Sequence, residues 1–310
     1  MELFPHDSNF NFMRLRWVSL AVAALLMVIA IAAMGINGFN YALDFTGGSV
    51  TELKFERAVE VEQVRQRLEK AGFDGAEVRN FGTGTDIVVR LPARASATHA
   101  TSGADVQKAA QAADNPATLV RSDTVGPQIG KELALNGMYA AFFVVLGFLG
   151  YVWVRFEWKF SVAAIIATLH DTLICAGWFA LSGHEFDLAV LAGILSVMGY
   201  SINDTIVVFD RVRENFRNLR VAPSEVLNRS VNQTLSRTII TSFVAFLTVL
   251  SLYIYGGTSL RGMAESQMIG IIIGTLSSIF VACPLLLWLG VTKQDLMPRA
   301  KEDPELARRP

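Results

Sequence analysis

Cysteine and histidine are scarce, with two cysteines and four histidines among 310 residues. Cys175 and Cys283 both fall inside apolar runs, where a free cysteine behaves as a small hydrophobic residue. The spacing of these residues supports neither a disulfide framework nor a Cys/His metal site.

Charge is also scarce. Charged residues make up 18% of the chain, against about 25% in ordinary soluble domains. Hydrophobic residues make up 52%, and apolar runs close to 20 residues long recur along the sequence. These features predict an integral membrane protein that also carries some soluble mass.

A nucleotide-binding loop is lacking too. Gly126-x3-Gly130-Lys131-Glu132 is one residue short of a phosphate-binding loop and has Glu at the Ser/Thr position. We therefore expect no cofactor and no enzyme activity. Any work would draw on an ion gradient, which supplies about 2.3 kcal/mol per charge and 100 mV.

Six apolar runs are long enough to cross a membrane. A signal peptide competes for the first, because Ala30-Ile31-Ala32 resembles a cleavage triplet. The uncharged run from Trp17 to Leu43 exceeds the roughly 7–15 residues of a signal core, which favours a retained span. The predicted spans are 17–36, 134–154, 160–181, 188–209, 238–255 and 267–289.

The segment 37–133 has the patterns of a small α+β domain, ferredoxin-like in its β-α-β-β order. Residues 92–115 are rich in Ala, Ser and Thr and predict an inserted loop with one weak helix. The predicted elements are strands at 50–55, 78–81, 86–91 and 117–123 and helices at 59–71 and 105–113.

Basic residues predict the orientation. They gather in residues 1–16, in the turn between the second and third spans, in the loop 210–237 and in the tail 291–310. The loop arginines are 211, 213, 217, 220, 229 and 237. By the positive-inside rule both termini are cytoplasmic and 37–133 lies on the far side of the membrane. Topology explains this basic loop better than nucleic-acid binding.

Asp204 lies within the fourth span, where a carboxylate costs roughly 2.5–3.5 kcal/mol to insert. Tyr200, Ser201 and Thr205 surround it with hydroxyl groups, which favours a proton carrier over a simple capping residue. Arg237 opens the fifth span and is either its counter-charge or an ordinary boundary arginine.

Asp171 follows His170 near the middle of the third span. The pair is either a weaker proton-transport candidate or a buried pair satisfied by Thr168 and Thr172. Adjacent helical positions predict that the two side chains lie on different faces.

Small residues recur every fourth position in the sixth span, which allows another helix to approach closely. That helix belongs either to this chain or to a partner subunit. The stripe consists of Ser266, Gly270, Gly274, Ser278 and Ala282.

Four blocks in order resemble the SecD/SecF family of protein-export membrane proteins along essentially the whole chain. Asp44, Phe45, Thr46, Gly47 and Gly48 follow the first span, and Val125-Gly126-Pro127 with Gly130 precedes the second. Residues 199–205 (GYSINDT) then run into residues 209–215 (FDRVREN). The two glycines of the first block suit a tight turn. The stretch 92–115 is longer than the family pattern.

The resemblance implies a complex with a SecD-like six-span partner, similar to the resistance-nodulation-division exporters. It implies association with the Sec translocon in the bacterial inner membrane and use of the proton-motive force to move unfolded preproteins. Asp204 and Arg237 match the family's proton-transport aspartate and arginine, whereas Asp171 carries no family role.

Two rival functions remain. Half of a proton-driven small-molecule exporter would need a larger pocket than 37–133 offers. A purely structural stabiliser of the translocon would tolerate Asp204→Asn but not disruption of Gly270 and Gly274.

Overall fold

The computed structural model describes residues 10–80, 84–92 and 102–296, which form two compact units. The helical unit is drawn from Met1–Phe39, Phe143–His184 and Ala189–Pro310, and the sheet unit from Asn40–Phe142 and Glu185–Leu188. Part of the expected insertion (93–101), the start of the N-terminal segment (1–9) and most of the tail (297–310) lie outside the described residues.

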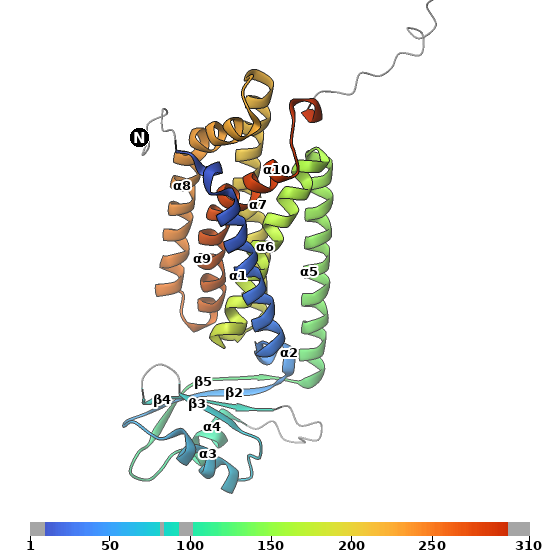
Figure 1. Ribbon diagram of the computed structural model, residues 1–310. Helices are drawn as coiled ribbons and strands as arrows, with labels where there is room; N and C mark the ends of the chain where they lie inside the picture. Colours follow the sequence, from blue (N-terminus) through green and yellow to red (C-terminus); the bar gives the residue numbers. More distant parts are fainter. Residues whose placement is uncertain (1–9, 81–83, 93–101, 297–310) are drawn as a thin grey trace, which may run out of the picture. The chain divides into compact units, whose positions relative to one another are not determined.

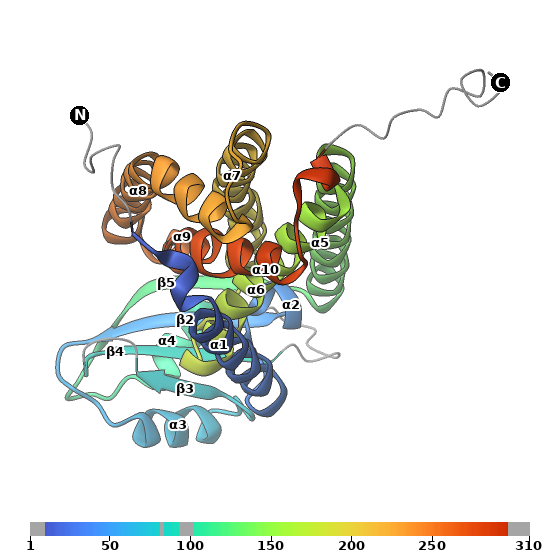
Figure 2. The same ribbon diagram turned by 45° about the horizontal axis from the view of Figure 1, so that its top comes forward.

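Six helices are long and apolar enough to cross a membrane, and with the sheet unit they confirm the predicted fold class (Figures 1 and 2). Their bounds are α1 Arg16–Ile36, α5 Pro127–Arg155, α6 Trp158–Ser182, α7 Leu188–Asn218, α8 Pro223–Tyr255 and α9 Thr258–Ser277, which runs on into α10 Cys283–Trp288. A short 3-10 helix, Phe12–Leu15, precedes α1. The α9 helix packs against both α8 and α6, while α6 also packs against α1.

The expected loop 210–237 is helical except for 219–222, because α7 extends to Asn218 and α8 begins at Pro223. Apolar residues at helical spacing between the arginines are buried and anchor these extensions. They are Val212, Phe216, Val226, Leu227, Val231 and Leu235.

The sixth span is not a regular α-helix throughout. A π-helical segment, Ser278–Ala282, joins α9 to α10. Pro284 lies just beyond it and has no backbone N–H to donate to the preceding turn, which gives this local widening a physical cause. Such π segments are frequent at functional sites.

The sheet unit contains a four-stranded antiparallel sheet in the order β3-β4-β2-β5. Its β-α-β-β-α-β sequence and strand order are those of the ferredoxin-like fold. Buried Leu53, Val64, Leu68, Val89 and Val106 form the core under two helices. The elements are β2 Gly48–Phe55, α3 Val61–Lys70, β3 Glu77–Asn80, β4 Asp86–Leu91, α4 Gly103–Ala110 and β5 Ala117–Val125.

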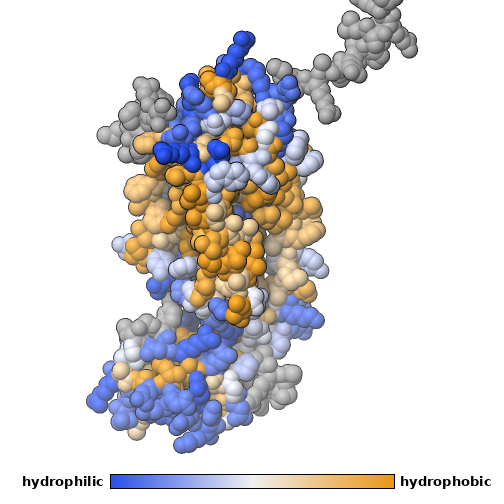
Figure 3. Space-filling model, viewed as in Figure 1, coloured by the Kyte–Doolittle hydropathy of each residue, from blue (hydrophilic) through white to orange (hydrophobic). Residues whose placement is uncertain are grey.

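The outer surface of the helices is apolar (Figure 3). Exposed large apolar side chains on α1, α5 and α8 include Leu25, Val28, Phe142, Phe143 and Phe243. A soluble protein rarely exposes so much contiguous apolar surface, whereas lipid covers it at no cost. The chain is therefore a multi-pass membrane protein.

Candidate functional site

Asp204 lies in the interior of the helical unit, with only 2% of its surface exposed. The Ser242 hydroxyl of α8 donates a hydrogen bond of 3.3 Å to its Oδ2. No cationic group lies within 4 Å of the carboxylate in the described parts of the chain. An anion buried without a counter-ion is expensive, so this carboxyl group is placed where a proton can neutralise it.

Hydroxyl groups from three helices meet beside Asp204. Ser242 accepts hydrogen bonds from Tyr200 of α7 at 2.9 Å and from Thr275 of α9 at 2.7 Å. Hydroxyls both donate and accept, so this cluster can reorganise as the charge of Asp204 changes. The sequence marked Tyr200, but Ser242 and Thr275 were missed, since their link to Asp204 depends on how α8 and α9 pack.

Arg237 makes no ion pair with Asp204 in this structure. It lies on α8 with an exposed side chain, and only a longer-range attraction connects its charge to Asp204. Ser242 follows Arg237 by five residues on the same helix and provides the direct contact instead.

Asp171 is fully buried on α6 and holds two side-chain partners. His170 Nδ1 lies 2.8 Å from its Oδ1, and Ser201 of α7 donates a hydrogen bond of 2.5 Å to Oδ2. The expectation that His170 and Asp171 lie on different faces was wrong, because the two side chains are in direct contact. Thr168 and Thr172 are not the partners either: the Thr172 hydroxyl donates to the Thr168 carbonyl.

The α7 helix brings the two carboxyl groups into one polar stretch. Ser201, the partner of Asp171, precedes Asp204 by three residues, a rise of about 4.5 Å on the same side of a helix. Among the described residues, His170 Nε2 and the Thr168 hydroxyl are buried nearby without a hydrogen-bond partner. Buried polar atoms usually have partners, so these two atoms retain hydrogen-bonding capacity inside the helical unit.

The small-residue stripe of the last span packs against α7 of the same chain. A Cβ on Gly270 would lie 2.1 Å from Val197 Cγ2, and a Cβ on Gly274 would lie 3.2 Å from Ser201 Cβ. Ser266 meets Gly193 in the same way one turn earlier. The stripe thus brings α9 against the polar face of α7, which favours internal packing over a partner surface. Ser278 is buried in the π-helical segment and donates to the Thr275 carbonyl at 2.9 Å.

The block Asp44–Gly48 forms a tight turn within the sheet unit. Leu43–Thr46 is a single helical turn, α2, and Gly47 and Gly48 follow with φ of 65° and 114°, a region that L-residues with side chains rarely adopt. Asp44 Oδ2 accepts a hydrogen bond of 3.1 Å from the Leu188 N–H at the start of α7. Gly130 of α5 passes so closely that a Cβ there would lie 2.9 Å from Gly47 N.

Other groups of the same block hold short strands in place. Thr46 Oγ1 accepts from Arg90 at 2.8 Å, and Phe45 packs on the rings of Tyr41 and Phe186. Tyr41 and Phe186 belong to a parallel pair of two-residue strands, β1 Asn40–Tyr41 and β6 Glu185–Phe186. The block therefore has a structural role.

Two family profiles match the chain. "Protein export membrane protein SecD/SecF, C-terminal" matches residues 105–292, and "SecD/SecF GG Motif" matches residues 32–59. The chain belongs to the SecD/SecF family. The second profile covers Asp44–Gly48, and the first covers Asp171, Asp204 and Arg237.

Sequence relatives and a solved structure support membership of this family. Protein translocase subunit SecF of Pseudomonas aeruginosa is 44% identical over 94% of this chain and 95% of its own length. Protein translocase subunit SecF of Escherichia coli O157:H7 is 42% identical over 94% and 92%. The crystal structure of SecDF, a translocon-associated membrane protein from Thermus thermophilus, gives a TM-score of 0.82 at 40% identity and covers 93% of this chain. This chain spans 39% of that SecDF chain.

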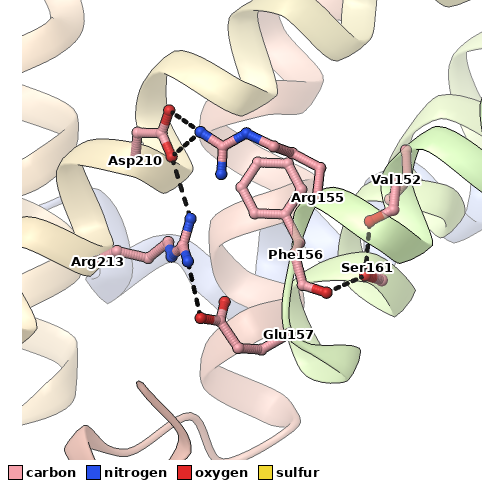
Figure 4. Close-up of polar contacts among 7 residues, drawn as sticks. All are labelled: Val152, Arg155, Phe156, Glu157, Ser161, Asp210 and Arg213. Atoms are coloured by element: carbon pink, nitrogen blue, oxygen red, sulfur yellow. Dashed lines mark hydrogen bonds and ion pairs between the residues drawn. The ribbon is translucent and has the colours of Figure 1, made fainter. Parts of the chain in front are cut away.

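The family block at residues 209–215 takes part in an ion-pair network (Figure 4). Arg155 donates to both carboxylate oxygens of Asp210, at 2.9 and 2.8 Å. Arg213 bridges Asp210 at 3.4 Å and Glu157 at 2.9 Å, and both arginines lie over the ring of Phe156. The network ties the α5–α6 turn to α7 and was missed because it joins residues more than fifty positions apart.

A second ionic contact holds the C-terminal 3-10 helix, Lys293–Leu296. Lys159 Nζ lies 2.8 Å from Asp295 Oδ2. Burial acts to raise the pKa of Asp295, but hydrogen bonds from Lys159 and Thr292 outweigh it and lower the pKa. Across the described ranges, no three His, Cys, Asp or Glu side chains cluster closely enough to hold a metal ion.

Proposed function

We propose that this chain is the SecF-like subunit of a Sec translocase accessory complex. In this proposal it uses the proton-motive force to assist the passage of unfolded preproteins across a bacterial inner membrane. The observation that carries the proposal is Asp204, a carboxyl group buried inside a membrane-spanning helix among hydroxyls instead of cations.

The proposed cycle alternates the charge of Asp204. When the carboxyl group is ionised, Ser242 donates to it and Arg237 is drawn toward it. When a proton neutralises it, that attraction ends and the hydroxyls of Tyr200, Ser242 and Thr275 exchange partners. Each charge moved through the potential supplies about 2.3 kcal/mol per 100 mV, enough to shift the balance between two helix packings. The proton gradient is the only energy source required, with no cofactor.

Movement of the helices would reach the sheet unit through the chain itself. The α1 helix leads directly into β1, and β6 leads directly into α7. The α5 helix has its first half in the sheet unit and its second half in the helical unit. With both termini cytoplasmic, as the basic segments indicate, the sheet unit lies in the periplasm, where it can grip an emerging chain.

The proposed partner is a SecD-like six-span protein. Protein translocase subunit SecDF of Brucella abortus is 36% identical over 99% of this chain, which covers only 41% of that protein. In that relative, a longer polypeptide therefore accompanies the region equivalent to this chain. The exposed apolar faces of α1, α5 and α8 offer surface for such a partner.

The test is Asp204→Asn in the complete complex. It keeps the size of the side chain and resembles the neutral, protonated carboxyl group, but removes the titratable group. We expect export to lose its dependence on the proton gradient, whereas Asp204→Glu retains part of it. Gradient-dependent export at wild-type level in the Asn variant would refute the proposal.

A further inference from the structure

We propose that His184 and Glu265 form an outer proton-loading site that passes protons to the His170–Asp171 pair. This inference rests on the proposed function, because it extends the path of the proton from Asp204 to the far end of the helical unit. Nothing in the family resemblance assigns a role to either residue.

The geometry at Glu265 suits proton uptake from solvent. His184 Nδ1 lies 2.8 and 3.0 Å from the two carboxylate oxygens, and Trp178 donates its indole N–H to Oε1 at 2.7 Å. The Glu265 side chain is 16% exposed, whereas that of His184 is 54% exposed. The imidazole is therefore the more exposed partner, while the carboxylate lies mostly covered behind it.

The same chemical pair occurs twice in the helical unit. Both histidines in the described part of the chain approach a carboxylate through Nδ1 at 2.8 Å, His184 at the end of α6 and His170 near its middle. Histidine is the side chain that most readily gains and loses a proton near neutral pH. One such pair is partly exposed at the end of α6 and the other is buried beside Ser201.

One face of α6 connects the two pairs. Trp178, Cys175 and Asp171 follow one another at spacings of three and four residues, so they line a single helix face over about 10 Å. Trp178 contacts Glu265, Cys175 donates to the Ser266 carbonyl at 3.2 Å, and Asp171 contacts Ser201 of α7. The path thus runs between α6 and α9 toward α7.

A layer of buried side chains closes this path. Cys175, Phe179 and Ser266 are all fully buried between the two pairs. Proton transfer then requires this layer to open to water. In that step an O–H bond at Glu265 breaks, water carries the proton, and an O–H bond at Asp171 forms, with no change in oxidation state.

In the described part of the chain, the titratable groups that interact with Glu265 from α6 and its C-terminal end are His184 and Cys175. On α9, Arg261 lies one turn away, and its guanidinium donates to the Tyr253 hydroxyl of α8 at 3.0 Å. His184 is thus the basic group in direct contact with the carboxylate.

The experiment measures proton-gradient-driven export by the complete complex in membrane vesicles, as a function of pH in the compartment that His184 faces. Glu265→Gln is expected to reduce the export rate by roughly tenfold at high pH and by much less at low pH. A tenfold loss is smaller than the factor that a positioned proton donor typically contributes. His184→Gln should give the same pH-dependent loss while leaving the covered carboxylate in place. Glu225→Gln, an exposed change whose partner is Arg229, is the matched control.

The outcomes distinguish failure of this inference from failure of the proposed function. A complex in which Asp204→Asn abolishes gradient-driven export but both His184→Gln and Glu265→Gln keep the wild-type pH profile would overturn this inference alone. If Asp204→Asn has no effect, the proposed function itself fails. If Glu265→Gln does not accumulate, the exposed His184→Gln still decides the question.

Discussion

Asp204 and Asp210 lie six residues apart on α7 and have opposite surroundings. Asp210 has a side chain 44% exposed and is held by Arg155 and Arg213. Asp204 is buried and has a serine hydroxyl as its direct partner. Two arginines bind Asp210, so its carboxylate fastens the α5–α6 turn to α7.

The difference separates two roles that the sequence places side by side. A carboxylate with fixed cations contributes to the packing of the α5–α6 turn against α7. A carboxyl group among hydroxyls can change charge while its neighbours rotate to suit either state. We therefore expect α7 to be fixed by ion pairs at Asp210 and to change its packing with the charge of Asp204.

The largest expected effect separates Asp204 from Asp210 directly. Asp204→Asn should abolish the proton-gradient dependence of export, because the group that titrates is gone. Asp210→Asn should preserve that dependence and lower only the amount of folded protein. Export assayed with and without an uncoupler, normalised to protein level, measures both. Equal loss of gradient dependence in the two variants would contradict the distinction.

Arg213→Ala is expected to destabilise the helical unit by roughly 1–3 kcal/mol, since it leaves Glu157 half-buried without its cation. Gradient dependence should survive in the molecules that fold. Thermal unfolding in detergent measures the stability, with the exposed Arg229→Ala as control. A normal melting temperature for Arg213→Ala would show that the network is not structural.

Ser242→Ala removes the direct hydrogen-bond partner of Asp204 and the acceptor of Tyr200 and Thr275. The hydrogen bond to Asp204 itself is worth about 1 kcal/mol, and Tyr200 and Thr275 can turn to other acceptors, so export should slow by about fivefold and still respond to the gradient. Ser251→Ala, an exposed serine on the same helix, is the matched control. Complete loss of gradient dependence in Ser242→Ala would mean that the hydroxyl, not the carboxyl group, is essential.

The smallest expected effect concerns Asp295. Its pKa is lowered in the folded protein, so its contribution is present above the usual carboxyl value of about 3.9 and is lost as the pH falls through the folded pKa. Asp295→Asn should therefore reduce stability at pH 7 by less than about 1 kcal/mol, and the difference should shrink in acid. Unfolding curves for both proteins over a pH series provide the measurement. A stability difference between the two proteins that grows in acid would contradict a lowered pKa for Asp295.

The spans and the ferredoxin-like order could be predicted because each depends on local hydropathy and periodicity. Asp204 could be predicted as a functional residue for the same reason. A carboxylate within an apolar run is unusual, whichever helices that run packs against. The helical extensions at 210–237 were missed because six arginines masked Val212, Phe216 and Val231 between them.

Other features depended on which helices meet. Gly270 and Gly274 indicated close packing, but only the structure identified α7 as the neighbour. The contacts of Asp171 with Ser201, of Arg213 with Glu157 and of Glu265 with His184 join distant parts of the chain. No spacing in the sequence encodes them.

The protonation of Asp204 can be measured directly by infrared spectroscopy of the reconstituted complex. We predict a carboxylic-acid carbonyl band that gains and loses intensity with pH in the wild type and in Asp210→Asn, and that is missing in Asp204→Asn. A wild-type spectrum identical to that of Asp204→Asn at every pH would contradict the account, because Asp204 would then never take up a proton.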